Sequence, residues 1–279
     1  MTFRITTIED FAKDIAHGLR TRQDAVMAVT GKERKGKTTW SIRFSKALAA
    51  ELNKSFSIRQ NLVYGKEGGL SRIEDKAINP IVDDEGTDNF NKADRWEKWQ
   101  TDLMKIFTKA GMYYKAYLIC MPNFFDFTKY WRDWRFRYWV WIPCRGRAIV
   151  FAPSENPFGL DTWNRRENEK LIYRIYKGAA DDVNKLLDAV RRSKNYMCEM
   201  EFEDLEPELK AEYEAYSYEF KRIKDEKKEA TEEKTRERVA IGRAVQLLRA
   251  YPRPLRFDWN ELADWLGFSD TQIQNFFKQ

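Results

Sequence analysis

Histidine and cysteine are scarce in this chain of 279 residues. His17 is the only histidine, and the three cysteines, Cys120, Cys144 and Cys198, lie far apart in the sequence. Zinc sites and disulfide frameworks need such residues in clusters at short spacings. We therefore expect no structural metal site and no disulfide scaffold. Cys120 lies in an apolar run, which predicts a core position.

Long apolar runs are also missing. Runs such as residues 116–121 are far shorter than the roughly 20 apolar residues that span a bilayer. The first residues carry no apolar segment of the signal-peptide type. We therefore expect no membrane association and a cytoplasmic location. The formal net charge of +6 is small for this length and indicates a polyanionic partner only weakly.

What the chain does contain is a phosphate-binding loop pattern, G-x-x-x-x-G-K-[ST], followed by a second threonine. An apolar run of strand type precedes the loop at residues 25–30, and residues 39–52 have helical spacing of apolar side chains. Phosphate binding requires a strand that delivers the loop and a helix that begins at its end. The context predicts a P-loop that binds ATP and Mg²⁺ through Gly31, Lys32, Glu33, Arg34, Lys35, Gly36, Lys37, Thr38 and Thr39.

A strand that ends in acidic residues is the expected partner of a P-loop, and residues 78–86 supply it. One carboxylate at such a strand end holds the water shell of Mg²⁺, and a second orients the attacking water. Asp84 and Glu85 fit these two roles, and Thr38 is the expected ligand of the metal itself. Asp83 is a competing choice for the metal residue, because three acids follow one another.

Two GTPase-like signatures are present but badly spaced. Asp83 and Gly86 form a D-x-x-G pattern, and residues 91–94 read Asn-Lys-Ala-Asp. A guanine-specificity motif should end its own buried strand, and residues 86–90 contain no such strand. ATP is therefore the expected nucleotide.

The periodicity of apolar residues predicts an α/β domain over residues 1–180, in which helices cover both faces of a parallel sheet. Its first helix is expected to begin with a capping box formed by Thr6 and Glu9. A helix is expected at 93–110, and strands are expected at 25–30, 61–64, 80–84, 115–121, 138–142 and 147–152.

A charged helical connector is predicted over 181–238. Residues 182–199 are expected to be helical, and an apolar stripe follows at Leu209, Tyr213, Tyr216, Phe220 and Ile223. Residues 224–238 have almost no apolar side chains, which is typical of a boundary. Residues 239–279 form a predicted trihelical helix-turn-helix module, with anchors at Leu262, Leu266 and Ile273, a turn glycine at 267 and a cap at Ser269.

Residues 23–165 resemble the ATPase domain of zonular-occludens-toxin-like proteins, which belong to the additional-strand, RecA-like class of P-loop NTPases. The resemblance is carried by residues 31–38, 81–86, 120–125, 132–137 and 145–148. It implies ATP hydrolysis, homo-oligomers that include rings, and DNA handling by a virus or mobile element. For a viral protein the location is the host cytoplasm. The phage-assembly members have a membrane span, whereas this chain has the predicted helix-turn-helix module instead.

In that framework Lys37 bridges the β- and γ-phosphates, and Asn123 senses the γ-phosphate from the end of the neighbouring strand. One of Arg132, Arg135 and Arg137 is expected to act as an arginine finger on the next subunit's nucleotide. Basic residues and aromatic residues alternate over 129–147. Such a pattern fits a groove for single-stranded nucleic acid, and it also fits aromatic side chains that pack in the core.

Two functions fit these features. The first is an ATP-driven enzyme that acts on DNA in translocation, packaging or replication. The second is an ATP-dependent assembly switch whose C-terminal module binds a DNA site or a protein. The module is nearly neutral in charge, so contact with a protein is its alternative to contact with DNA.

Overall fold

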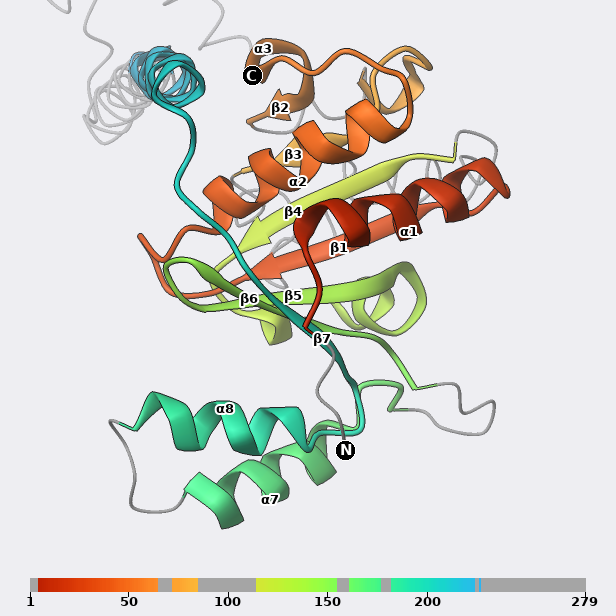
Figure 1. Cartoon of the computed structure of the whole chain (residues 1–279), viewed down its shortest axis with the longest axis vertical. Helices are drawn as coiled ribbons and strands as arrows, with labels where there is room; N and C mark the ends of the chain where they lie inside the picture. The colour runs from red at the N-terminus through yellow and green to blue at the C-terminus, as the bar shows by residue number, and fades with distance from the viewer. Residues whose placement is uncertain are drawn as a thin grey trace, which may run out of the picture. The chain divides into compact units, whose positions relative to one another are not determined.

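The computed structural model describes residues 5–64, 72–84, 114–154, 161–176, 182–223 and 226. The chain divides into two compact units, Met1–Phe220 and Lys221–Gln279. The predicted helix over 93–110 and the predicted helix-turn-helix over 239–279 lie outside the described residues. Figure 1 shows the first unit as a twisted sheet with helices packed against it.

The sheet of the first unit has seven strands within the described residues, in the order β2-β3-β4-β1-β5-β6-β7. Central strand β1 (Ala25–Thr30) pairs in parallel with β4 (Ala116–Met121) and with β5 (Phe136–Cys144). Beyond β4, β3 (Ile81–Asp83) and then β2 (Leu62–Val63) continue the parallel pairing. The carboxyl ends of these five strands therefore meet at one edge of the sheet.

The other end of the sheet is antiparallel, which corrects the prediction of a purely parallel sheet. Strand β6 (Arg147–Phe151) pairs antiparallel with β5 and with β7 (Tyr196–Glu201). A two-residue turn at 145–146, with Gly146 at φ 87°, joins β5 to β6. So short a connection can only reverse the chain, whereas a parallel neighbour needs a long crossover.

Two further predictions are corrected by β7. The predicted helix over 182–199 ends early, because the helical part is Val183–Arg191 (α8) and the chain turns at 192–195 into β7. The predicted domain boundary at residue 180 is also wrong, because β7 belongs to the sheet and the first unit extends to Phe220.

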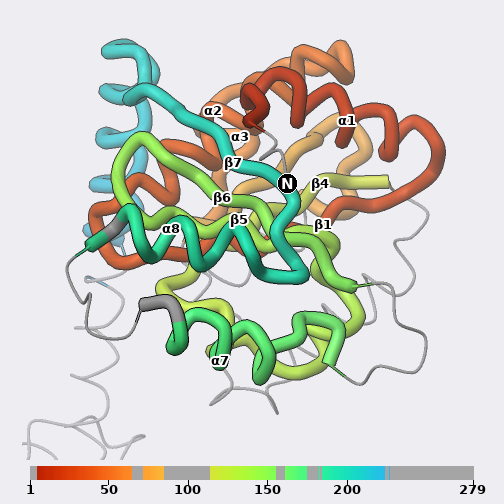
Figure 2. Tube along the Cα trace, turned by 60° about the horizontal axis from the view of Figure 1, so that its bottom comes forward, coloured from red at the N-terminus to blue at the C-terminus, as the bar shows by residue number. Residues whose placement is uncertain are grey.

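Helices cover both faces of the sheet, as the sequence predicts. Helices α1 (Ile8–Arg20) and α2 (Lys37–Glu51) lie on one face, and α7 (Arg165–Tyr176) and α8 lie on the other (Figures 1 and 2). Side chains of β1 alternate between the two cores: Met27 and Val29 belong to the core under α1 and α2, and Val26 and Ala28 belong to the opposite one. Cys120 is buried, which confirms its predicted core position.

The cap of α1 is Thr7, one residue later than predicted. The Thr7 side chain accepts a hydrogen bond from the backbone N–H of Asp10, at 3.0 Å. The backbone N–H of Thr6 instead donates to the carbonyl of Glu199, so Thr6 belongs to the extended segment that pairs with β7. The predicted capping box of Thr6 with Glu9 is therefore not formed.

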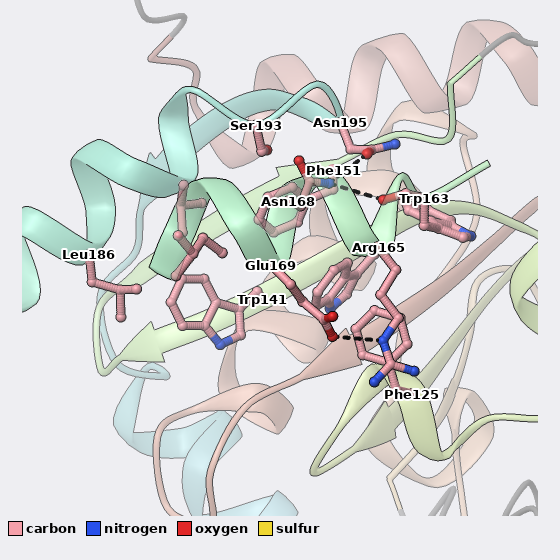
Figure 3. Close-up of a pocket in the computed structure, with 13 residues that line it drawn as sticks. Phe125, Trp141, Phe151, Trp163, Arg165, Asn168, Glu169, Leu186, Ser193 and Asn195 are labelled. Carbon is pink, nitrogen blue, oxygen red and sulfur yellow. Dashed lines mark hydrogen bonds and ion pairs between the residues drawn. The ribbon is translucent and has the colours of Figure 1, made fainter. Parts of the chain in front are cut away.

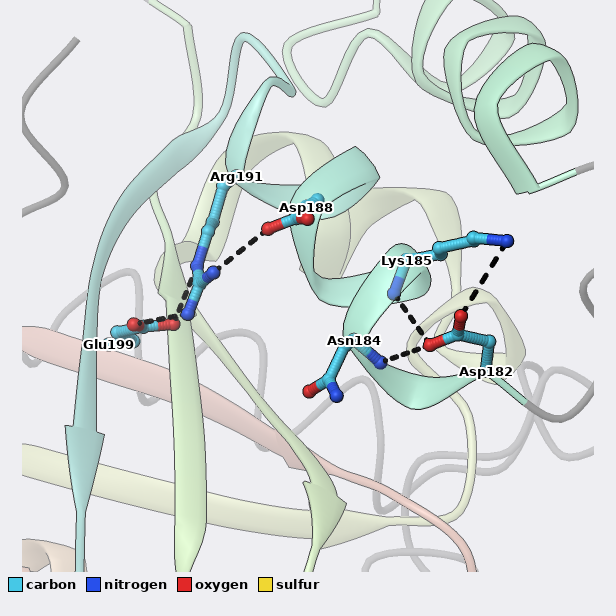
Figure 4. A network of polar contacts seen from close by, with 6 residues as sticks. All are labelled: Asp182, Asn184, Lys185, Asp188, Arg191 and Glu199. Atoms are coloured by element: carbon cyan, nitrogen blue, oxygen red, sulfur yellow. Dashed lines mark hydrogen bonds and ion pairs between the residues drawn. The ribbon is translucent and has the colours of Figure 1, made fainter.

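Helix α8 is fixed at both ends by charged side chains (Figure 4). At its start the carboxylate of Asp182 accepts from the backbone N–H groups of Asn184 and Lys185. At its end the guanidinium of Arg191 donates to Glu199 of β7 at 2.7 Å, and it also donates to Asp188. The Glu199 side chain is only 9% exposed, so the pair with Arg191 compensates the burial of its charge.

A helix over residues 207–223 follows β7. Its predicted apolar stripe is confirmed in part, because Leu209, Tyr213, Tyr216 and Phe220 pack against the core under α1 and α2, whereas Ile223 is exposed. Up to Phe220 this helix is thus part of the first unit and not of a separate connector. It reaches the carboxyl edge of the sheet, where the predicted nucleotide site lies.

Candidate nucleotide-binding site

The loop between β1 and α2 has the geometry of an anion cradle. Its last residue, Gly36, adopts a left-handed conformation with φ 98° and precedes α2, whose first amides have no side-chain cap. An uncapped helix N-terminus carries unpaired N–H groups and a partial positive charge, and it therefore attracts phosphate. The sequence predicts this strand, loop and helix, and the structure has them in place.

The first glycine of the loop cannot carry a side chain. A Cβ atom on Gly31 would lie 2.6 Å from the carbonyl oxygen of Ile142, and its φ of 153° is unfavourable for other residues. Its backbone N–H donates to the carbonyl of Pro122 at 3.3 Å. The loop is therefore held between the ends of β4 and β5.

The side chain of Lys37 turns back over this loop. Its Nζ donates to the carbonyl oxygens of Gly31 at 2.8 Å and Lys32 at 3.1 Å. The ammonium group is thus enclosed by the loop, at the mouth where phosphate oxygens would approach the amides. Among the other loop residues, Lys32, Glu33 and Arg34 are exposed.

Thr38 and Asp84 meet in this site, although they are 46 residues apart in the sequence. Thr38 is the second residue of α2, and Asp84 directly follows β3. The hydroxyl of Thr38 donates to Oδ1 of Asp84. Hydroxyl and carboxylate oxygens are ligands that Mg²⁺ accepts beside nucleotide phosphates, so this pair fits the expected metal.

The neighbouring acid, Asp83, points to the opposite face of the sheet. It is fully buried and accepts a hydrogen bond from the hydroxyl of Tyr117 at 3.3 Å. Burial, and then the negative charge of Asp83, raises the pKa of Tyr117, so this phenol stays a donor. Because successive side chains of a strand alternate, only Asp84 can face Thr38. Glu85, the predicted water-orienting residue, lies outside the described residues.

Two tyrosines that the sequence did not connect with the site also bind Asp84. The hydroxyls of Tyr64 and Tyr213 donate to its Oδ2 at 3.2 and 3.1 Å. Burial, together with the charge of Asp84, raises the pKa of both tyrosines. Tyr213 belongs to the apolar stripe of the 207–223 helix. The helical spacing predicts that stripe, but nothing in it indicates a carboxylate partner.

The segment after β7 also touches the loop. A Cβ atom on Gly36 would lie 3.4 Å from the ring of Phe202 and 3.9 Å from Cγ of Arg145. The guanidinium of Arg145 donates to Asp204 at 2.6 Å. Arg145, from the turn between β5 and β6, thus lies beside the P-loop, a position that local residue spacing does not predict.

Asn123 follows β4 at the same edge of the sheet, as predicted. Its side-chain oxygen accepts from the backbone N–H of Phe125 at 3.1 Å, and its amide donates to Asp126 at 3.4 Å. The side chain therefore caps the short η3 turn (Phe124–Asp126). Its predicted role as a γ-phosphate sensor stays a prediction.

The three candidate finger arginines lie at the edge opposite to the P-loop. Arg132 and Arg135 belong to the short η4 helix (Trp131–Arg135), which leads into β5, and Phe136 pairs with Val26 near the start of β1. Arg137 donates to the side chain of Gln23 at 2.8 Å. Contact between Arg137 and a γ-phosphate would thus require a second copy of the chain. The guanidinium of Arg132 lies over the ring of Phe125, 5.5 Å from its centroid.

The aromatic residues near these arginines are mostly packed inside. Trp131 and Phe136 are buried. Trp139 and Trp141 line a cavity of about 250 Å³ together with Phe125 and Phe151, between β5, β6, α7 and α8 (Figure 3). Trp134 is 78% exposed. This packing favours the core interpretation of the aromatic pattern over a groove lined by stacked bases.

Comparison with known proteins adds no relative. No protein-family model matches the chain, and no curated protein matches it significantly. Among the residues that the structure describes, no helix is both long and apolar enough to cross a bilayer. In the same residues, no group of three or more histidine, cysteine or acidic side chains is arranged to hold a metal ion.

Proposed function

We propose that this protein binds and hydrolyses ATP with Mg²⁺ and uses the cycle to act on DNA, as a translocation, packaging or replication-associated motor of a virus or mobile element. The observation that carries the ATPase proposal is the contact between Thr38 and Asp84 beside the uncapped start of α2. Thr38 of the P-loop and Asp84 of the acidic strand, which are distant in the sequence, thereby lie at the same site.

Each residue has a defined task in this proposal. The amides at the start of α2 and the ammonium of Lys37 bind the phosphates, and Thr38 and Asp84 hold Mg²⁺ against them. When bound there, Mg²⁺ would supply positive charge against the transferring phosphoryl group. Glu85 orients the attacking water, and Asn123 senses the γ-phosphate. These last two roles rest on the sequence.

The strand order supports the additional-strand, RecA-like class within P-loop proteins. Strand β4 lies between β1, which delivers the P-loop, and β3, which delivers Asp84. An inserted strand at this position is what distinguishes that class. A RecA-like ATPase similar to the zonular-occludens-toxin-like proteins is therefore our proposal for the family.

Action on DNA and assembly into homo-oligomers rest on sequence features. The helix-turn-helix pattern of residues 239–279 supports DNA binding. The placement of Arg132, Arg135 and Arg137, away from their own P-loop, fits a site that is completed by a neighbouring subunit.

The second candidate is an ATP-dependent assembly switch, and one contact favours it. Tyr213 ties Asp84 to the helix over residues 207–223, whose last residues belong to the second unit. A switch needs such a connection and needs no rapid turnover.

The test is steady-state ATP hydrolysis by the full chain, alone and with single- or double-stranded DNA. Many-fold stimulation by DNA is expected for a motor, whereas slow turnover that ignores DNA supports the switch. The control is Lys37→Ala, which should bind no ATP. Failure of the wild-type chain to bind Mg²⁺–ATP would reject both functions.

A further inference from the structure

We propose that Tyr213 is a positioning residue for Asp84, and that through it the 207–223 helix responds to Mg²⁺–ATP binding. This inference rests on the proposed ATP site. It concerns a part of the chain outside the P-loop and the acidic strand.

The carboxylate of Asp84 is held from two sides by separate elements. Thr38 of α2 donates to Oδ1, whereas Tyr64, which follows β2, and Tyr213 donate to Oδ2. The two tyrosine hydroxyls thus fix the rotation of the carboxylate so that Oδ1 faces Thr38. A metal ligand that is oriented in advance binds its ion with less loss of freedom.

Other contacts of the same helix include a hydrogen bond between Ser217 and Tyr64, aromatic packing and an ion pair. The ring of Phe220 stacks on that of Tyr64 at 4.7 Å, and Glu219 forms an ion pair with Arg59 at 2.9 Å. The hydroxyl of Tyr216 points to the backbone carbonyl of Leu62 at 3.5 Å. From this helix, Tyr213 donates directly to the carboxylate of Asp84.

The segment that leads into this helix is anchored beside the phosphate loop. Asp204 accepts from Arg145 at 2.6 Å and from Lys210 at 3.3 Å, and Glu206 pairs with Lys46 of α2 at 2.8 Å. Residues 202–213 consequently run from Gly36 to Asp84. Both ends of this stretch touch groups that the proposed nucleotide and metal would contact.

Thermodynamic linkage gives the direction in which binding of Mg²⁺–ATP changes the hydrogen bond between Tyr213 and Asp84. If the hydrogen bond from Tyr213 favours the metal-binding orientation of Asp84, then bound Mg²⁺–ATP must favour that hydrogen bond by the same factor. Loss of a residue that orients a metal ligand typically costs about 10- to 100-fold in metal affinity. Metal-loaded nucleotide should thus tighten the attachment of the helix.

The test compares Tyr213→Phe with Tyr216→Phe in the full chain. Both variants remove one hydroxyl from a half-buried tyrosine of the same helix, but only Tyr213 bonds to Asp84. We expect Tyr213→Phe to weaken binding of a fluorescent ATP analogue roughly tenfold in the presence of Mg²⁺ and to leave its binding in EDTA unchanged. Tyr216→Phe should keep the wild-type Mg²⁺ dependence.

Hydrogen exchange supplies a readout that is independent of catalysis. Amides of residues 207–220 should gain protection when Mg²⁺–ATP binds the wild-type chain, and Tyr213→Phe should lose most of that gain. The unfolding midpoint of each variant shows whether it is folded, and Tyr64→Phe repeats the test if Tyr213→Phe does not fold. Equal Mg²⁺ dependence and equal protection in wild type and Tyr213→Phe would overturn the inference. A wild-type chain that binds no nucleotide would instead reject the ATP site itself.

Discussion

The hydroxyl of Thr38 donates directly to the carboxylate of Asp84, which joins the start of α2 to the end of β3. Asp83, one residue earlier, faces the opposite core and pairs with Tyr117. The register of the acidic run thereby separates one carboxylate that can serve a metal from one that is structural. This separation can be tested.

Asp84→Asn should reduce Mg²⁺-dependent ATP turnover at least about a hundredfold, because it removes a charged ligand at the site where charge develops. Asp83→Asn should change turnover by a few-fold at most, since its side chain is buried on the other face. Steady-state kinetics of both variants check the prediction. The opposite ranking would mean that Asp83 serves the metal.

Lys37→Ala and Glu85→Gln should separate binding from chemistry. Loss of the Lys37 ammonium removes a ground-state contact with phosphate and should abolish ATP binding, whereas Glu85→Gln should bind ATP normally and stop hydrolysis. Equilibrium binding and single-turnover measurements on each variant distinguish the two effects. Normal turnover by Glu85→Gln would assign the water-orienting role to another residue.

Gly31→Ala should destabilise the fold by about 3 kcal/mol, because its Cβ would clash with a backbone oxygen in an unfavourable backbone region. Gly18→Ala is the matched control. Gly18 lies inside α1, where a Cβ would meet only Gln23 Oε1 at 3.4 Å, so alanine should stabilise the chain by about 0.5–1 kcal/mol. Urea unfolding of both variants measures the difference. Equal free energies of unfolding would contradict the clash.

A chain that ends at residue 238 should remain a folded ATPase and should lose most of its affinity for duplex DNA. The described strands and the two cores of described residues lie within Met1–Phe220, and the predicted helix-turn-helix is removed. DNA binding at several salt concentrations checks this. Unchanged affinity with a shallow salt dependence in both chains would assign residues 239–279 to protein contact.

One of Arg132→Ala, Arg135→Ala and Arg137→Ala should lower turnover about 10³-fold or more and leave nucleotide affinity nearly unchanged, as an arginine finger would. Mixing that variant with Lys37→Ala should restore activity at mixed interfaces, because each protein supplies what the other lacks. Activity that stays at the sum of the two separate proteins would exclude a site shared between subunits.

Local sequence patterns predicted the strand, loop and helix of the P-loop, because glycine, lysine and threonine at those spacings serve a local geometry. The short connection between the predicted strands 138–142 and 147–152 already implies their antiparallel pairing, whereas β7 was missed for a physical reason. Glu199 and Glu201 in residues 196–201 make that strand resemble a solvated helix, and burial of Glu199 depends on its pair with Arg191. Contacts of this kind depend on the tertiary fold and leave no periodic signal. The contact between Tyr213 and Asp84 also leaves no such signal, because the spacing of the apolar stripe predicts only a helical face.

The path of residues 202–220 has a mechanical consequence. The chain passes Gly36 and Asp84 before it enters the second unit at Lys221, and it is fixed on the way by Arg145, Lys46 and Arg59. Tension carried along this helix from its C-terminal end would therefore load the contacts of Phe220, Glu219 and Tyr216 before it loads the hydrogen bond from Tyr213 to Asp84. The carboxylate of the proposed metal site is thus the last of these contacts to be strained.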